Sequence, residues 1–237
     1  MLKRRWLGMT WRDGLFCHWP VEPAVVAETL PDRLSVATHG RTAYLGVVAF
    51  VMDDIRPRGA PVGLTFPELN LRTYVEGPDG PGVYFYNLDA DDPIGVAVAR
   101  RLFALPYYRA DMDASRTETA DRSERGGGLV RFTSRRTHRG APHARFDATY
   151  GPTGEAYAAE PGSLDAFLVE NYRFYAAGNR LYRGEIDHKP WTLRAATVDF
   201  RANTLFEANG FDRPDGDPIV HYAEPIEVDA DRIRPVR

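Results

Sequence analysis

Clusters of Gly, Pro and Asp interrupt this 237-residue chain at short intervals, and no other feature constrains its fold as strongly. They are PRGAPVG (57–63), EGPDGPG (76–82), RGGG (125–128), RGAP (139–142), GPTG (151–154) and FDRPDGDP (211–218). These residues favour turns and disfavour the interiors of helices and strands. Short segments between frequent turns are typical of an antiparallel sheet or barrel. None of the clusters is long enough for an interdomain linker, so we expect a single domain over residues 1–237, with 1–10 and 230–237 at its periphery.

The segments between the clusters predict a mostly β (α+β) fold with a few flanking helices. Strands are expected over residues 42–51, 69–75, 83–90, 129–137, 144–150, 180–188, 193–200 and 219–228. Helices are expected over residues 21–30 and 93–105, and a third is expected to begin at Ser163. Asp92 can cap the second helix, and Pro93 suits its first position.

Charge and composition restrict the partners of the chain. The formal net charge is −3, whereas a nucleic-acid-binding protein usually has an excess of basic residues. Cys17 is the only cysteine, which excludes an intramolecular disulfide. No apolar run resembles the core of a signal peptide or approaches the roughly 20 residues of a membrane span. We therefore expect a cytoplasmic protein with neither nucleic acid nor membrane as a partner, while the oligomeric state stays open.

The stretch FPELNLRTYVEGPDGPGVYFYNLDADDP (66–93) predicts a hairpin with one polar face. If its strands pair symmetrically about the loop, side-chain alternation gives one face Glu68, Asn70, Arg72, Tyr74, Tyr84 and Tyr86. Residues two apart on a strand lie about 7 Å from each other, so several of these groups could contact one small molecule. A solvent-exposed face, with Arg stacked on Tyr, is the alternative interpretation.

Other candidate site residues lie outside this hairpin. Tyr107, in LPYYRADMD (105–113), brings another phenol to the same region. His18 in HWP and His188 in HKPW are either packed near strand ends or placed at the mouth of a pocket, where imidazole can act as an acid or base. The spacing of His, Asp and Glu matches no metal site, and no phosphate or dinucleotide motif is present. We expect no metal and no cofactor.

Eight ordered motifs resemble those of the YqjF-like family of uncharacterised bacterial and archaeal proteins. They are HWP (18–20), FPELNLRTYV (66–75), GVYFYNLDA (82–90), ARRLFALPYYRA (99–110), SRR (134–136), PGSLDAFLVENY (161–172), LYRGEIDHKPW (181–191) and VHY (220–222). The family is a domain of unknown function and is similar to the acetoacetate decarboxylase-like superfamily. That resemblance implies a cone-shaped antiparallel β barrel that encloses a pocket.

The resemblance also bears on the reaction. In the decarboxylases, a lysine in Gly-Phe-Pro-Lys forms a Schiff base with the substrate ketone. The resemblance places the glutamate of those enzymes on or near Glu68, a helix arginine on Arg100, and the lysine on Tyr107. A phenol cannot form an iminium with a ketone, so the resemblance supports the fold and counts against Schiff-base decarboxylation. Lys189 is the remaining lysine to consider, and we expect it at an exposed strand end.

Three hypotheses for the function follow. The leading one is a barrel that binds a small organic acid or carbonyl compound, with Arg72 or Arg100 as the partner of a carboxylate. The second is an enzyme that uses Glu68 as a general base and Tyr107 as a proton donor, in an enolisation, dehydration or hydrolysis. The third is a protein-interaction domain, which requires the polar hairpin face to meet bulk solvent or a partner chain. The sequence does not decide whether the protein is an enzyme.

Overall fold

The computed structural model describes residues 6–92, 96, 105–117, 128–178 and 180–236. In this part of the chain, fourteen strands form one sheet. The strands are β1 (Leu7–Val21), β2 (Ser35–Val36), β3 (Ala43–Pro57), β4 (Leu64–Gly77), β5 (Gly80–Ala90), β6 (Tyr107–Thr117), β7 (Leu129–Arg136), β8 (Arg145–Pro152), β9 (Arg173–Ala177), β10 (Leu181–Asp187), β11 (Leu193–Asn203), β12 (Ile219–Ala223), β13 (Ile226–Ala230) and β14 (Arg234–Pro235). The helices are α1 (Pro23–Ala27), α3 (Leu164–Val169) and α4 (Leu205–Ala208).

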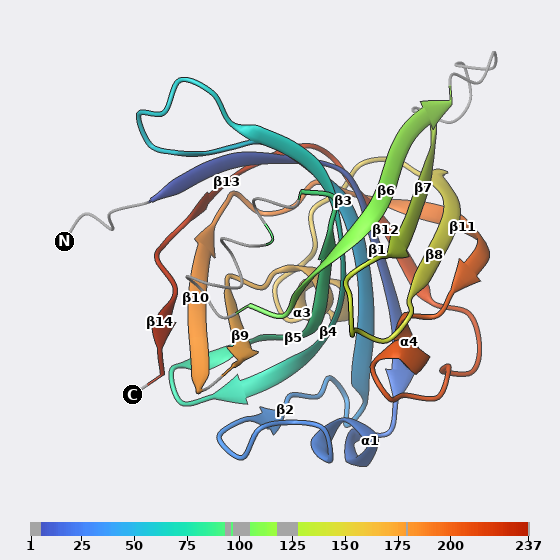
Figure 1. Ribbon diagram of the computed structural model, residues 1–237. Coiled ribbons are helices and arrows are strands. Elements are labelled where there is room, and N and C mark those ends of the chain that lie inside the picture. The colour runs from blue at the N-terminus through green and yellow to red at the C-terminus, as the bar shows by residue number, and fades with distance from the viewer. Residues whose placement is uncertain (1–5, 93–95, 97–104, 118–127, 179, 237) are drawn as a thin grey trace.

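The sheet closes on itself twice, because β12 pairs with β1 and β4 pairs with β5 in addition to the linear strand order. One ring runs through β1, β3, β4, β5, β9, β10 and β13. The other runs from β5 through β6, β7, β8, β11 and β12 back to β1. Figure 1 shows the two halves on either side of the long central strands β1, β3 and β4. The central strands are therefore a wall that both rings share.

One ring is packed with side chains. Along β4, Leu69 and Leu71 point into it and join Phe132, Phe146 and other residues in a continuous apolar core. The intervening residues of β4 point into the other ring, which contains a cavity. Alternation along one strand therefore supplies a solid core on one side and a lined pocket on the other.

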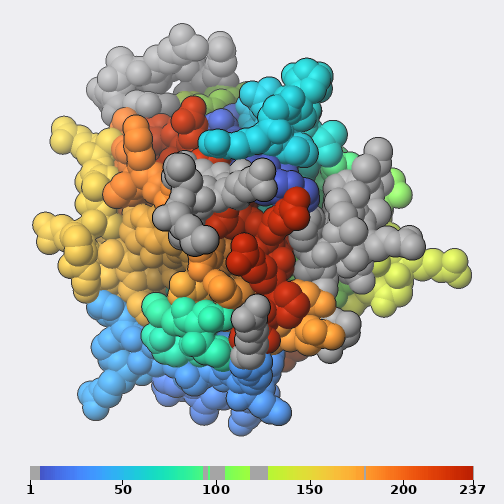
Figure 2. Space-filling view, turned by 90° about the vertical axis from the view of Figure 1, so that its left-hand side faces the viewer, coloured from blue at the N-terminus to red at the C-terminus, as the bar shows by residue number. Residues whose placement is uncertain are grey.

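The outer wall of the hollow ring comes largely from the C-terminal part of the chain. β10 pairs with β9, β13 and β14, and β13 pairs with β1. In the space-filling view of this side, the red C-terminal segment lies across the centre of the face (Figure 2). None of the described helices is long and apolar enough to cross a membrane.

The two rings separate at β5, because the edge of this strand that does not pair with β4 pairs with two different strands. Val83 and Tyr84 pair with β9, whereas 88–90 pair with β6, and both pairings are parallel. A register shift between Leu71 and Arg72 leaves Tyr86 as an extra residue opposite β4. This β-bulge lies between the two paired segments, at the point where the rings part.

The predicted mostly β, acetoacetate decarboxylase-like fold class is confirmed, with the two short parallel pairings at β5 as its exception to antiparallel order. The expected strand over 219–228 is two strands, since Glu224 and Pro225 separate β12 from β13. The expected strands do not include β1, β2, β6, β9 or β14. Ser163 caps α3 as expected, where its hydroxyl accepts a hydrogen bond from the Ala166 amide at 3.2 Å. The helix expected over 93–105 lies outside the described residues, except for positions 96 and 105.

Candidate functional site

A cavity of about 350 Å³ occupies the hollow ring, a volume within the usual range for small-molecule sites. Its lining comes from β1, β3, β4, β5, β6, β9, β10, β12, β13 and α3 together with the segments that connect them. Large aromatic rings make up much of the wall: Trp11, Phe16, Phe50, Phe66, Phe85 and Trp191. None of these six residues was predicted from the sequence, because aromatic side chains on alternating strands have the same pattern whether they fill a core or line a cavity.

A row of three polar groups on β4 interrupts this apolar wall. Glu68, Asn70 and Arg72 all line the cavity and are buried, with exposed fractions of 3%, 2% and 8%. They occupy alternate positions of one strand, as the sequence predicts, and their intervening neighbours belong to the packed core. The interaction-domain hypothesis required this face to meet solvent or a partner chain, and the burial contradicts that requirement.

At one end of the row, Glu68 accepts a hydrogen bond of 2.6 Å from the hydroxyl of Tyr107. Burial raises the pKa of Glu68 to about 7, although the hydrogen bonds from Tyr107 and Asn70 oppose the rise; the negative charge of Asp89 adds to it. Burial and the adjacent carboxylate of Glu68 raise the pKa of Tyr107 well above its usual value. Near neutral pH, Glu68 can therefore take up or release a proton, while Tyr107 keeps its own.

At the other end of the row, Arg72 lies against α3. Its Nη2 donates to the carbonyl of Leu168 at 3.3 Å, and its guanidinium carbon lies 5.2 Å from the ring centre of Phe16. The Nε atom is buried and has no hydrogen-bond partner among the described residues. Tyr74 donates to the same Leu168 carbonyl at 2.7 Å, and burial raises the pKa of its phenol to about 12. Tyr74 is not among the residues that line the cavity.

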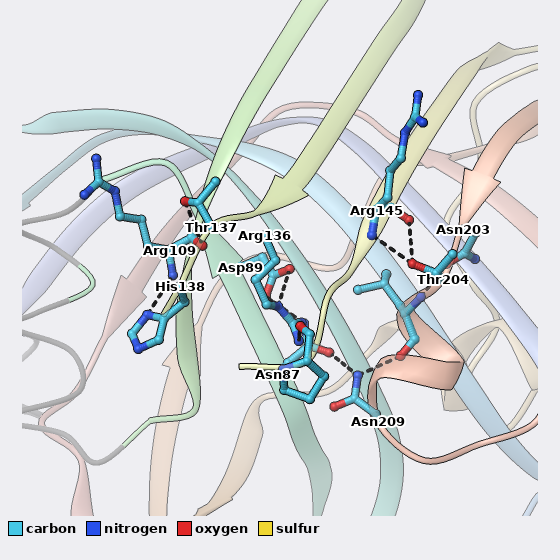
Figure 3. A network of polar contacts seen from close by, with 12 residues as sticks. Asn87, Asp89, Arg109, Arg136, Thr137, His138, Arg145, Asn203, Thr204 and Asn209 are labelled. Carbon is cyan, nitrogen blue, oxygen red and sulfur yellow. Dashed lines mark hydrogen bonds and ion pairs between the residues drawn. The ribbon is translucent and has the colours of Figure 1, made fainter. Parts of the chain in front are cut away.

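A second buried cation lies behind the site and is fully paired. Arg136 donates to Asp89 at 2.8 Å through Nη2 and at 3.1 Å through Nε, and both side chains are 1% exposed. Asn87 donates to the same carboxylate at 3.2 Å and accepts from Asn209 at 2.7 Å (Figure 3). Burial raises the pKa of Asp89 to about 6 despite the charge of Arg136. No spacing pattern in the sequence indicates this network, which lies on the opposite face of the sheet from Glu68.

The symmetric pairing expected for the hairpin is wrong, and two predicted residues lie elsewhere as a result. Because Tyr86 is the extra residue of the bulge, Arg72 pairs with Phe85, and Tyr84 pairs with Thr73. Phe85 therefore lines the cavity, whereas Tyr84 and Tyr86 do not. The hydroxyl of Tyr86 lies 2.7 Å from that of Thr29, and its ring packs against Tyr84.

The two candidate histidines differ in their access to the cavity. His18 is fully buried beside Arg72 but is not among the lining residues. Burial, together with the positive charge of Arg72, holds the pKa of His18 well below its usual value. His188 lines the cavity, and its Nδ1 lies 2.6 Å from the carbonyl oxygen of Lys189.

Lys189 is exposed and is not among the cavity-lining residues. Arg100 lies outside the described residues, as does Lys3. Within the described ranges, no group of three or more His, Cys, Asp or Glu residues is arranged to hold a metal ion.

Comparison with known proteins places this architecture in a family. Residues 8–227 match DUF2071, described as an uncharacterized conserved protein. The chain belongs to the DUF2071 family. The predicted resemblance is thereby confirmed: the chain is 39% identical over 223 residues to the uncharacterized protein YqjF of Bacillus subtilis (strain 168), which covers 92% of this chain and 88% of that protein.

Solved structures similar to this DUF2071 protein share its fold at low sequence identity. The enduracididine biosynthesis enzyme MppR, in a complex with pyruvate, is 13% identical with a TM-score of 0.65, over 99% of this chain and 91% of that one. An acetoacetate decarboxylase-like enzyme from Sphingomonas wittichii RW1 is also 13% identical with a TM-score of 0.65, over 98% of this chain and 94% of that one. At this identity, the similarity establishes the acetoacetate decarboxylase-like fold alone.

Proposed function

We propose that this protein binds a small organic acid or carbonyl compound with an apolar body, and that Arg72 is the partner of its carboxylate. One observation carries the proposal. Arg72 is a buried cation in the cavity wall, and no described carboxylate forms an ion pair with it. Buried charges in proteins are normally paired, because an isolated ion in an apolar environment is strongly destabilising.

A second buried arginine in the same protein, Arg136, provides a comparison for Arg72. Arg136 is equally buried, but it faces the packed ring and is paired with Asp89. Arg72 faces the cavity, and the groups beside its guanidinium are the Leu168 carbonyl, the ring of Phe16 and the phenol of Tyr74, none of which is an anion at neutral pH. The side of Arg72 that faces the cavity is therefore the side on which a ligand carboxylate could pair with it. A carboxylate can accept two parallel hydrogen bonds from a guanidinium, which makes it a suitable partner.

The cavity walls support an apolar body for that acid. Aromatic side chains from β1, β3, β4 and β5 surround the space between Arg72 and Glu68. Glu68 and Arg72 are four residues apart on one strand, so their Cα atoms lie about 13 Å from each other. A hydrocarbon chain or ring of several carbons fits that interval and would bury its surface against these side chains.

Schiff-base decarboxylation is not part of the proposal. Tyr107 stands at the position that the resemblance gives to the reactive lysine, and its hydroxyl is engaged with Glu68. No lysine lies among the residues that line the cavity in the described part of the chain. Without an iminium to accept the electron pair, the carbanion left by carbon dioxide has no stabilising group of that kind.

Calorimetric titration with octanoate, hexanoate and 2-oxooctanoate tests the binding proposal. We expect at least one of these acids to bind the wild type, and we expect Arg72→Met to weaken it by about tenfold or more, since the charge-assisted contact is lost. Tyr84→Phe is the matched control, because that phenol lies outside the cavity. Equal affinity of Arg72→Met and the wild type would rule out Arg72 as the carboxylate partner.

The Glu68–Tyr107 pair favours acid–base catalysis as a second candidate function. A carboxylate with a pKa of about 7 is suited to remove a proton from the carbon next to a carbonyl group. That proton would pass to Glu68, while Tyr107 would turn its hydrogen bond to the carbonyl oxygen and stabilise the enolate charge. Because its pKa is raised, Tyr107 acts in this proposal as a hydrogen-bond donor that retains its proton.

Deuterium exchange tests the catalytic candidate separately from binding. 2-Oxooctanoate in D₂O would exchange its C3 hydrogens faster with the wild type than with Glu68→Gln, as followed by proton NMR. Tyr107→Phe is expected to slow the exchange while the acid still binds. Binding without any acceleration of exchange would contradict enolisation and leave the binding proposal intact.

A further inference from the structure

Two buried acceptor atoms in the cavity wall have no donor within the described residues. They are Oδ1 of Asn70 and Nε2 of His188. Buried polar atoms in folded proteins are almost always hydrogen-bonded, to protein, water or ligand. An acceptor is satisfied only by a group that carries a hydrogen, so these two atoms restrict the chemistry of whatever fills the cavity.

The orientation of Asn70 follows from its neighbour. Its side-chain amide interacts with the Glu68 carboxylate, which is an acceptor, so the NH₂ group is assigned to the end that faces that carboxylate. The carbonyl oxygen is then the other end of the amide, and an amide oxygen only accepts. Asn70 lies between Glu68 and Arg72 on β4, so this acceptor is at the middle of the polar row.

The tautomer of His188 follows from the backbone. Its Nδ1 lies 2.6 Å from the carbonyl oxygen of Lys189, and a carbonyl oxygen cannot donate. Nδ1 therefore carries the hydrogen, and in the neutral ring Nε2 has a free lone pair. Tyr172 stacks on this imidazole at 4.6 Å and Trp191 packs against it at 5.0 Å, which fixes its plane.

Glu170 holds both of these flanking rings in place. It accepts from the hydroxyl of Tyr172 through Oε2 and from the backbone amide of Trp191 at 2.8 Å through Oε1. The position of Nε2 in the cavity wall is thus determined by three side chains around it. An acceptor fixed in this way, like that of Asn70, is suited to recognition of a specific donor.

We infer that the acid bound in this cavity is a hydroxy acid, whose hydroxyl donates to Asn70 or to His188. The inference rests on the proposed function and narrows its ligand class. A keto oxygen only accepts: it could pair with the buried, unpartnered Nε1 of Trp11 but with neither of these two atoms, whereas a hydroxyl can donate as well as accept. An unsubstituted fatty acid adds nothing that these two atoms can bind. An ammonium group would also donate, but burial of its charge in this largely apolar cavity costs more than burial of a neutral hydroxyl. A site that is built to hydrogen-bond a hydroxyl rejects analogues that lack it.

A matched set of four acids tests the inference on the wild-type protein. The dissociation constants of octanoate, 2-oxooctanoate, 2-hydroxyoctanoate and 3-hydroxyoctanoate are measured by calorimetry. We expect one of the hydroxy acids to bind at least about tenfold more tightly than octanoate and 2-oxooctanoate, the effect of one well-formed hydrogen bond. Equal or tighter binding of the two acids without a hydroxyl would overturn the inference, whereas failure of all four to bind would overturn the proposed function itself.

Two variants identify the acceptor. Asn70→Leu and His188→Phe keep much of the side-chain shape and remove the acceptor atom. The variant at the position that accepts from the hydroxyl is expected to reduce the ratio of hydroxy-acid affinity to octanoate affinity to about one. If that position is His188, His188→Gln, which restores a side-chain oxygen, is expected to recover part of the ratio. If both variants keep the wild-type ratio, neither atom accepts a hydrogen bond from the hydroxyl and the inference is wrong.

Nitrogen NMR of the wild type provides a readout that needs no variant. The ¹⁵N resonances of the His188 ring and the Asn70 side-chain amide are compared with octanoate and with the tighter hydroxy acid bound. A change at one of these two groups that only the hydroxy acid produces supports the inference. Identical spectra for both complexes would mean that ordered water satisfies the acceptors in each, which would contradict it.

Discussion

Tyr107 donates a 2.6 Å hydrogen bond to Glu68 inside a cavity whose walls are otherwise largely apolar. The bond joins the start of β6 to the polar row of β4, two strands that are separated in the sheet by β5. It opposes the effect of burial on Glu68, whose pKa nevertheless rises to about 7. The pair thus combines a carboxyl group that titrates near neutrality with a phenol that does not.

Glu68 should make the stability of the protein depend on pH. Its folded-state pKa of about 7 is above the ordinary value of 4.5, so the folded state retains a proton that the unfolded chain releases. The stabilisation is fully present below pH about 4.5 and is lost as the pH rises through about 7. The unfolding free energy of the wild type, taken relative to that of Glu68→Gln, should therefore fall by about 3 kcal/mol from pH 4 to pH 8.

Urea unfolding of both proteins at several pH values measures this difference. Asp89, whose pKa is also raised, is present in both, so its contribution largely cancels. A difference that stays constant between pH 4 and pH 8 would show that Glu68 ionises in the folded state at its ordinary pKa.

Removal of the Tyr107 hydroxyl should raise the pKa of Glu68 further. The ionised carboxylate loses a charge-assisted hydrogen bond, whereas burial and the charge of Asp89 remain. Tyr107→Phe is expected to move the Glu68 titration upward by about one unit, as measured by ¹³C NMR of the side-chain carboxyl. Tyr86→Phe is the control, since that hydroxyl lies next to Thr29 outside the cavity; a Glu68 pKa that is unchanged or lower in Tyr107→Phe would contradict the hydrogen bond.

The two buried arginines should respond differently to loss of charge. Arg136→Met leaves Asp89 as an unpaired buried carboxylate and is expected to destabilise the protein by about 3–5 kcal/mol. Arg72→Met leaves no such group, because its guanidinium has no carboxylate partner among the described residues, and its effect is expected to stay within about 1 kcal/mol. Urea unfolding at pH 7.5 in the absence of added acids measures both. An equal loss in the two variants would mean that Arg72 has a stabilising partner after all.

The sequence was sufficient to predict the polar row of β4, because alternation along one strand depends only on local geometry. Glu68, Asn70 and Arg72 share a face for the same reason that Leu69 and Leu71 share the opposite one. The placement of Tyr107 beside Glu68 was suggested by the family resemblance, since the two residues are 39 positions apart and meet only through the closure of the sheet.

The sequence was not sufficient wherever a register irregularity breaks alternation. The bulge at Tyr86 moves Phe85 into the cavity and turns Tyr84 away from it, and no residue of GVYFYNLDA marks that bulge. β1 was missed for a related reason. Its pairing with β3 is interrupted between Arg12 and Leu15, where Asp13 adopts a positive φ of 58°, so the strand shows no continuous period of two.

Gly46 provides the last prediction, because it determines how closely Arg72 and His18 can approach. It lies on β3 directly between them, paired with His18 on one side and with Arg72 on the other. A Cβ atom at this position would lie 2.9 Å from Cδ2 of His18 and 3.4 Å from Cγ of Arg72. Both neighbours are buried and have little room to move, so Gly46→Ala is expected to destabilise the protein by about 1–3 kcal/mol. It should also weaken acid binding, since the guanidinium would be displaced from its place over Phe16.

Gly8→Ala is the control: its Cβ would meet only Asp229 Oδ1, at an ordinary 3.7 Å. Loss of stability in Gly46→Ala with unchanged affinity for the acid would mean that the position of Arg72 does not determine binding, and the carboxylate contact would have to be assigned to another residue.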